Sequence, residues 1–318
     1  MSTGDTLFSL FFLIGLGYLA RRTLLVGQPL ATVNTFVYYF AVPALLFNSA
    51  IGIAAEQLFK PYFISAFLLA AAITAAVTLI GSRLLLREKT ESYDKARMVV
   101  QALTATFANY AYMGIPLVFG LLGENSYAAT ITVILAGNLF LVAGAQLMLE
   151  VLQPSAGNPQ RSRLVQGLQL LDRSLLRSPV FLATVAGVTV SAMGWQLPQI
   201  IATPLNMLAP AAIPVALFCL GASLEFKAIG KYRVELIWML LIKLVLHPLI
   251  TLITLQLMGI TDPDWLIPTV LLTALPTGAL AHVIAARYQI AEQVTSLTIV
   301  LSTLLSAVSL WGWVYWLV

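Results

Sequence analysis

Long segments without a charged residue recur from one end of the chain to the other, and this restricts the fold more than any other feature. A helix that crosses a bilayer needs about 20 mostly apolar residues. Charged residues make up only 9% of the chain, against roughly 25% in a soluble domain. We therefore predict an all-α polytopic membrane protein with ten transmembrane helices in a lipid bilayer. The predicted spans are 5–21, 30–51, 61–83, 97–121, 127–150, 177–195, 202–224, 233–258, 265–287 and 293–317.

The basic residues predict how these spans are oriented. Of the 17 Lys and Arg residues, 15 fall in the odd-numbered loops, whereas the even loops hold only Lys60 and the eighth span holds Lys243. Because cytoplasmic loops carry the excess of Lys and Arg, we expect the odd loops to be cytoplasmic and both termini to lie outside. The first apolar stretch has no basic segment before it, so no cleavable signal peptide is expected.

The chain divides into two halves that resemble each other. Residues 1–150 hold five predicted spans, residues 151–176 form a cytoplasmic linker rich in Pro, Gly and Ser, and residues 177–318 hold five more. Pro-x-x-Leu-Phe occurs at Pro43 in span two and at Pro214 in span seven. Because each half has an odd number of spans, the second half is inverted relative to the first. We interpret the chain as a 5+5 inverted repeat.

Spans four and nine are interrupted at corresponding places. Asn109, Tyr110, Gly114 and Pro116 break the apolar run of span four. In span nine the break consists of three consecutive residues, Pro276, Thr277 and Gly278. One interpretation is a pair of simple proline kinks. The other is a pair of discontinuous helices that cross inside the membrane, since paired interruptions in two halves indicate a transporter site.

A crossing of broken helices would form a binding site for a charged solute. The half-helices that start at a break aim unpaired N–H groups and a partial positive charge at it, with Pro116 and Pro276 suited to their first turns. The other half-helices expose carbonyl groups, which could hold a cation. No Asp or Glu lies at the centre of a predicted span, and this favours an anionic substrate.

Three basic side chains are candidates for coupling or charge balance. Lys243 lies deep in span eight, where burying a charge in the membrane costs free energy. An ionisable residue at such a position is taken as a candidate functional residue. Lys243 could bind free carbonyls of the break as a structural plug, or act as a fixed cation in place of a metal ion. His247 and His282 are either packing residues or proton carriers. In span five, Asn138 is either an interhelical hydrogen-bonding residue or a substrate contact.

Missing motifs exclude other classes. The chain lacks Gly-x-x-x-x-Gly-Lys-Ser/Thr, so no ATP-driven pump is expected. It has two His and one Cys, so no metal centre or internal disulfide is expected. The net charge of +4 follows membrane topology and does not indicate nucleic-acid binding. We predict neither an enzyme nor a bound cofactor.

The chain resembles the auxin efflux carrier family, including its bacterial members that are described as malate or malonate transporters. The residues that carry the resemblance are ANYAYMGIPLVFGLLG at 108–123, ALPTGALAHVIAARY at 274–288, KLVLHP at 243–248 and the two Pro-x-x-Leu-Phe segments. Unlike plant members, span three has no acidic residue and the loop after span five is short.

The resemblance implies a fold related to bile-acid symporters and sodium/proton antiporters, in a bacterial inner membrane. Spans 1, 2, 6 and 7 would form a scaffold and a homodimer interface. Spans 3–5 and 8–10 would form a transport domain that moves as an elevator. The anion would bind near Asn109, Pro116 and Pro276.

The predicted function is a secondary transporter of small organic anions, such as malate, malonate or auxin-like acids. The first alternative is a cation/proton antiporter of the same fold, with Lys243 and the two histidines in the coupling path. The second is a membrane sensor that does not transport, although the chain contains no soluble output domain.

Overall fold

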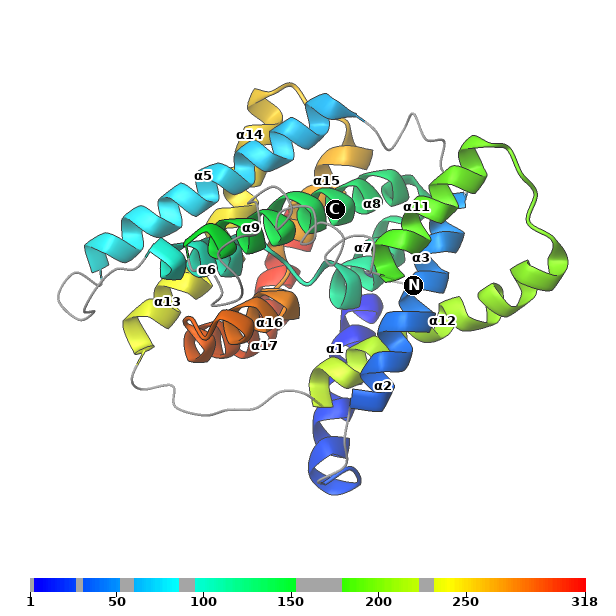
Figure 1. The fold of residues 1–318 in the computed structure, drawn as a ribbon, viewed down its shortest axis with the longest axis horizontal. Coiled ribbons are helices and arrows are strands. Elements are labelled where there is room, and N and C mark those ends of the chain that lie inside the picture. Colours follow the sequence, from blue (N-terminus) through cyan, green and yellow to red (C-terminus); the bar gives the residue numbers. More distant parts are fainter. Residues whose placement is uncertain (1–2, 27–30, 52–59, 86–94, 153–178, 223–231) are drawn as a thin grey trace, which may run out of the picture. The chain divides into compact units, whose positions relative to one another are not determined.

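The computed structural model describes residues 3–26, 31–51, 60–85, 95–152, 179–222 and 232–318 (Figure 1). These ranges are predominantly helical and contain no strand, as predicted. The predicted linker lies outside the described residues, except for its first two. Each of the ten predicted spans coincides with one helix or one run of consecutive helices. Five of these are long and apolar enough to cross a membrane as continuous helices, so the count of ten crossings stays a prediction, as do the inverted repeat and the orientation of the termini.

The helices gather into two compact units. The first unit comprises Met1–Pro61, Tyr110–Ile134 and Leu176–Glu225, and the second comprises Tyr62–Asn109, Leu135–Leu175 and Phe226–Val318. Predicted spans 1, 2, 6 and 7 therefore belong to the first unit and spans 3, 8, 9 and 10 to the second. Spans 4 and 5 are each divided between the two units.

The first unit is built from closely packed helices. Their bounds are α1 (Thr3–Thr23), α2 (Ala31–Phe36), η1 (Val37–Ala41), α3 (Val42–Ile51), α7 (Ile115–Leu122), α11 (Pro179–Ala192) and α12 (Gln199–Ala222). Helix α1 packs on α12, and α11 packs on α3. A Cβ at Gly17 would collide with the Phe218 carbonyl, and one at Gly221 with the Ile14 carbonyl. Glycine at both positions lets the α1 and α12 backbones touch.

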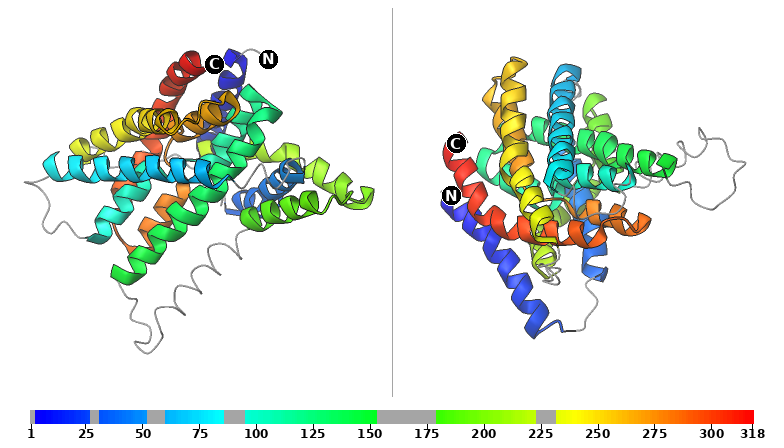
Figure 2. Two further views of the ribbon diagram at one scale, coloured as in Figure 1. Left: turned by 90° about the horizontal axis from the view of Figure 1, so that it is seen from above. Right: turned by 90° about the vertical axis from the view of Figure 1, so that its left-hand side faces the viewer.

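The second unit contains the interrupted helices. Its bounds are α5 (Pro61–Leu85), α6 (Lys95–Thr106), η4 (Gly137–Val142), α9 (Ala143–Leu152), α13 (Arg233–Leu241), η7 (Ile242–Leu246), α14 (His247–Leu257), α15 (Pro263–Ala274), α16 (Ala279–Tyr288) and α17 (Glu292–Leu317). Figures 1 and 2 show α5 alongside α13 and α14. The Trp238 indole of α13 packs on Gly81 and donates to the Thr78 carbonyl of α5 at 3.1 Å.

A buried ion pair joins α6 to α13. The carboxylate of Glu235 is 2.8 Å from Arg97 Nη2, and Gln101 Nε2 donates to the same carboxylate at 2.6 Å. Glu235 is almost fully buried, whereas the Arg97 side chain remains 21% exposed. The charge of Glu235 is therefore compensated at the beginning of both helices, which keeps it compatible with an apolar surrounding.

Candidate functional site

The two predicted interruptions are present, and they meet within the second unit. Helix α6 ends at Thr106 and α15 ends at Ala274, and each is followed by a short extended segment. These segments form an antiparallel bridge between Ala108 and Thr277. The Asn109 amide donates to the Pro276 carbonyl at 2.9 Å, and the Gly278 amide donates to the Phe107 carbonyl at 3.0 Å. The interpretation as two simple proline kinks is therefore wrong.

Local sequence explains why the backbones can approach so closely. A Cβ on Gly278 would lie 2.6 Å from Phe107 Cε1 and 2.7 Å from the Ala108 carbonyl oxygen, closer than ordinary van der Waals contact. Pro276 has no N–H and cannot continue the α15 hydrogen-bond pattern. The Thr277 amide instead donates to Ser302 Oγ of α17 at 3.2 Å.

The extended segments differ from the predicted breaks at Tyr110, Gly114 and Pro276, whereas Pro116 lies in the first turn of a helix as predicted. In the first interrupted segment only residues 107–109 are extended, and the chain is helical again in η2 (Tyr110–Gly114) and α7. Gly114 and Pro116 thus lie inside this helical run, with Pro116 in the first turn of α7. Pro276 was expected in the first turn of a half-helix, but it lies in the extended segment, three residues before α16 begins. A proline fits at this position because the extended segment needs no backbone N–H donor there.

The freed carbonyls of the broken helices find donors. The last carbonyls of any helix lack intrahelical partners, and in an apolar medium each must be satisfied. The Thr277 hydroxyl donates to the Thr104 carbonyl near the end of α6 at 2.9 Å. Lys243 Nζ lies 3.1 Å from the Thr273 carbonyl near the end of α15. Each break is thus stabilised by one side chain from another part of the second unit.

Lys243 and His247 form a buried pair beside the crossing. Both are fully buried, and Lys243 Nζ lies 3.1 Å from His247 Nδ1. Lys243 belongs to η7, a π-helical turn within the eighth predicted span. His247 Nε2 is buried without a hydrogen-bond partner among the described residues, and so is His282 Nδ1 in α16. The contact with Thr273 matches the carbonyl-binding role considered for Lys243, and it also places an amino group beside the crossing.

The hydrogen bonds leave few amides of the crossing for a ligand. Those of Asn109, Thr277 and Gly278 already have protein acceptors. The next amides are those of Ala279 and Leu280, which begin α16 and have no preceding helical carbonyl. Both residues are exposed. The first turn of α16 therefore offers backbone N–H groups at the crossing, whereas the three amides of the bridge segments are already hydrogen-bonded.

The remaining predicted site residues fall in both units. Asn109, which is 5% exposed, ends the extended segment in the second unit, and Tyr110, which is 2% exposed, begins the first-unit stretch that also holds Gly114 and Pro116. Asn138 is half-buried in η4 of the second unit. The structure thus brings Asn109, Pro276, Thr277 and Gly278 together.

The sequence analysis missed the polar face of α17. Thr295, Thr298, Ser302 and Ser306 are buried there at intervals of three or four residues. Thr295 Oγ1 lies 3.3 Å from Thr104 Oγ1, and Ser302 accepts the Thr277 amide. The spacing of small hydroxyl residues in an otherwise apolar helix could have indicated this supporting face.

Comparison with known proteins identifies the family of this chain. The family described as "Membrane transport protein" matches residues 4–314. The chain belongs to the membrane transport protein family. This confirms the resemblance to the auxin efflux carrier family, and the matched region includes both crossing segments and Lys243. Membership indicates a transporter and not an enzyme.

Two relatives match nearly the whole chain. A protein of Rhizobium meliloti (strain 1021) named "Putative malonate transporter" is 31% identical over 309 residues, covering 96% of this chain and 92% of the relative. A protein of Methanothermobacter thermautotrophicus (strain ATCC 29096 and its equivalents) named "Uncharacterized transporter" is 25% identical over 315 residues, covering 98% of each.

Proposed function

We propose that the protein is a secondary transporter of small organic anions, with malonate and malate as the first candidates and auxin-like acids next. The observation that carries the proposal is the antiparallel bridge between Ala108 and Thr277, which holds two helix ends and the start of α16 at one place. The name of the Rhizobium meliloti relative supports a short dicarboxylate.

The charges near the crossing favour an anion. Among the described residues of the second unit, Glu235 is the acidic residue that is buried, and its carboxylate is paired with Arg97. Lys243 lies beside the end of α15 with its amino group toward the crossing segment. A cation or proton antiporter of this architecture usually has a buried carboxylate at its site, whereas an anion is held by N–H donors and a nearby positive charge.

The proposed mechanism is elevator-type alternating access, with the protein acting as a homodimer in the plasma membrane. The chain passes from the second unit to the first between Asn109 and Tyr110, directly after the crossing. In the proposal, predicted spans 3–5 and 8–10 form the transport domain that carries the anion, and predicted spans 1, 2, 6 and 7 form the fixed scaffold. Tyr110, Gly114, Pro116 and Asn138 complete the site in this proposal.

Uptake into proteoliposomes tests the proposal. Purified protein is reconstituted, and the uptake of labelled malonate is measured with and without a pH or sodium gradient. We expect saturable uptake of labelled malonate, and we expect unlabelled malate to inhibit it by competition. Organic anion flux that is absent under every gradient would overturn the proposal.

Asn109→Ala tests the site itself. The variant keeps the backbone N–H at position 109, which donates a hydrogen bond to the Pro276 carbonyl. The fold should therefore survive while malonate binding and uptake are lost. Asn125→Ala, at an exposed residue of the short η3 helix (Glu124–Ser126), is the matched control and should leave both unchanged. Unchanged malonate affinity in Asn109→Ala would remove this residue from the site.

One observation favours the alternative of a cation/proton antiporter. The buried Lys243–His247 pair could carry a proton beside the crossing. In that case, sodium would exchange for protons in proteoliposomes that contain no organic solute. Flux of malonate without such exchange would exclude the alternative, and binding of malonate without any flux would indicate a sensor.

A further inference from the structure

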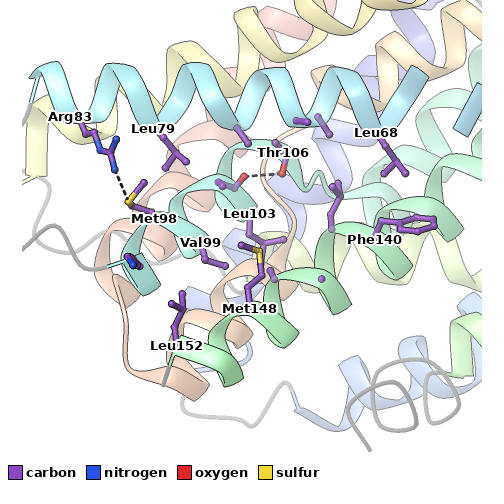
Figure 3. A pocket seen from close by; sticks show the side chains of 18 residues that line it. Leu68, Leu79, Arg83, Met98, Val99, Leu103, Thr106, Phe140, Met148 and Leu152 are labelled. Atoms are coloured by element: carbon purple, nitrogen blue, oxygen red, sulfur yellow. Dashed lines mark hydrogen bonds between the residues drawn. The ribbon is translucent and has the colours of Figure 1, made fainter. Parts of the chain in front are cut away.

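A cleft of about 640 Å³ lies within the second unit, and its lining includes none of the bridge residues 107–109 and 276–278. It separates one face of α5 from α6 and from the η4–α9 segment (Figure 3). The opposite face of α5 packs on α13 and α15 through Gly81 and Phe63, whose ring lies edge-on to Trp265. Helix α5 is therefore held on one side and leaves the other side open.

Small residues create the cleft. The middle of the α5 face carries Ala71, Ala72 and Ala75, and the facing helices carry Ala102, Gly144 and Ala145. On α5, Ala71 and Ala72 precede Ala75 by four and three residues, so the three share one face of the helix. Larger apolar side chains line the two ends, with Leu68 and Phe140 at the end opposite Arg83 (Figure 3).

The lining is apolar except at a few positions. Of the 18 lining residues, only Arg83, Lys95 and Thr106 have polar side chains, and the Thr106 hydroxyl donates to the Ala102 carbonyl at 2.8 Å. Water in such a cleft would lack the two to four polar partners that it needs. An empty cleft would forfeit the dispersion contacts of its walls. In a bilayer, a hydrocarbon chain is the filling that meets both conditions.

One end of the cleft is basic. Arg83 and Lys95 are exposed there, and Arg83 Nη2 contacts Met98 Sδ at 3.5 Å. Neither side chain forms an ion pair with a described carboxylate. Between residues 83 and 97 the sequence holds five basic and three acidic residues. The positive-inside rule places this end at the cytoplasmic leaflet, where anionic lipids attract Lys and Arg.

We infer that this cleft is a binding site for an anionic phospholipid, with one acyl chain between α5, α6 and α9 and the headgroup phosphate at Arg83 and Lys95. The face of α5 from Leu68 to Arg83 rises by about 22 Å at 1.5 Å per residue. That length suits a long acyl chain and exceeds what a short dicarboxylate would occupy. The site is distinct from the proposed substrate site and does not depend on it.

Native mass spectrometry of the full chain in a neutral detergent tests the inference. The protein is incubated with equal amounts of dioleoyl phosphatidylglycerol and dioleoyl phosphatidylcholine, and the lipids retained are counted. We expect phosphatidylglycerol to be preferred by at least about fivefold, since each basic residue near an anionic headgroup contributes about that factor. Retention of the two lipids in equal amounts would overturn the inference.

Charge variants locate the headgroup. The double variant Arg83→Gln/Lys95→Gln should bring the lipid preference close to one. The matched control Arg22→Gln/Arg233→Gln removes two exposed basic residues from the same predicted membrane side, outside the cleft, and should keep the preference. An unchanged preference in the first variant, or an equal loss in both, would contradict the assignment of the headgroup to this end.

A cleft-filling variant locates the acyl chain. Ala75→Phe should reduce the retention of both lipids, whereas Ala76→Phe, on an exposed position outside the cleft, should not. Soluble glycerol phosphate should not displace the retained phosphatidylglycerol, and displacement would show an anion site without an acyl chain and so overturn the inference. If Ala75→Phe does not fold, the charge variants decide, because their side chains are exposed.

Discussion

Replacing Thr277 by valine removes one hydroxyl and nearly nothing else. The hydroxyl is the donor to the Thr104 carbonyl at 2.9 Å, and Thr277 is fully buried. Because α6 ends at Thr106, no helical N–H follows to satisfy that carbonyl. Thr277→Val would leave it buried and unpaired, which costs about 1–3 kcal/mol. For a unit of this size that is roughly 2–12 °C in melting temperature.

Thr298→Val is the matched control. Thr298 is equally buried, and its hydroxyl donates to the Val294 carbonyl at 2.8 Å within the continuous helix α17. That carbonyl keeps its own helical N–H partner when the hydroxyl is removed. The control should therefore lose less than about 1 kcal/mol, because no group is left unpaired. Thr277→Ser, which keeps the hydroxyl, should stay close to the native protein.

Hydrogen exchange followed by mass spectrometry measures the effect where it arises. The amides of Asn109 and Gly278 close the bridge, so they should exchange about 5- to 150-fold faster in Thr277→Val, which is the same 1–3 kcal/mol expressed as an opening equilibrium. Thermal unfolding in detergent gives the global value. Equal exchange and equal melting temperatures in Thr277→Val and Thr298→Val would refute the reasoning that the hydroxyl holds the crossing.

Three further perturbations test other parts of the second unit. Gly278→Ala should open the bridge and abolish malonate binding in an equilibrium binding assay, because the added Cβ would lie 2.7 Å from the Ala108 carbonyl oxygen. The control Gly312→Ala should bind malonate normally, because its Cβ would have no neighbouring atom within 4 Å. Lys243→Met should lower the melting temperature, because the loss of a hydrogen bond from a charged group costs about 1.5–3 kcal/mol. A native melting temperature would contradict the contact with Thr273. Uptake by this variant that is restored by added sodium would show that Lys243 acts as a fixed cation. Arg97→Gln should destabilise the protein by up to about 3–5 kcal/mol, because it leaves the buried Glu235 carboxylate without its ion-pair partner. In thermal unfolding it should lower the melting temperature more than Glu235→Gln does. A larger decrease in Glu235→Gln would refute this reasoning.

Much of the helix arrangement could be predicted because apolar length is a local property. The predicted span 61–83 is α5 (Pro61–Leu85), and the predicted span 293–317 is α17 (Glu292–Leu317). The two interruptions were also predictable, since Pro276 and Gly278 interrupt an apolar run whose breaking is expensive. These signals need no knowledge of which residues become neighbours.

The exact site could not be predicted because it depends on contacts between distant residues. The first break falls at residues 107–109, so it includes the predicted Asn109 but neither Gly114 nor Pro116. A glycine and a first-turn proline are both tolerated inside a helical run, so their presence does not locate a break. The donors to Thr104 and Thr273 come from 173 and 30 residues away, and no sequence spacing links these pairs.

The helix ends at the crossing carry partial charges that cancel. The C-terminal ends of α6 and α15 contribute about half a negative charge each, and the N-terminal ends of α16 and of the helical run that starts at Tyr110 contribute about half a positive charge each. The backbone alone therefore gives no preference for either sign of solute. The ammonium form of Lys243, 3.1 Å from the Thr273 carbonyl, offsets the end of α15 and leaves a net positive charge. In the proposed transporter, the choice of an anion thus depends on one buried side chain more than on the broken helices that form the site.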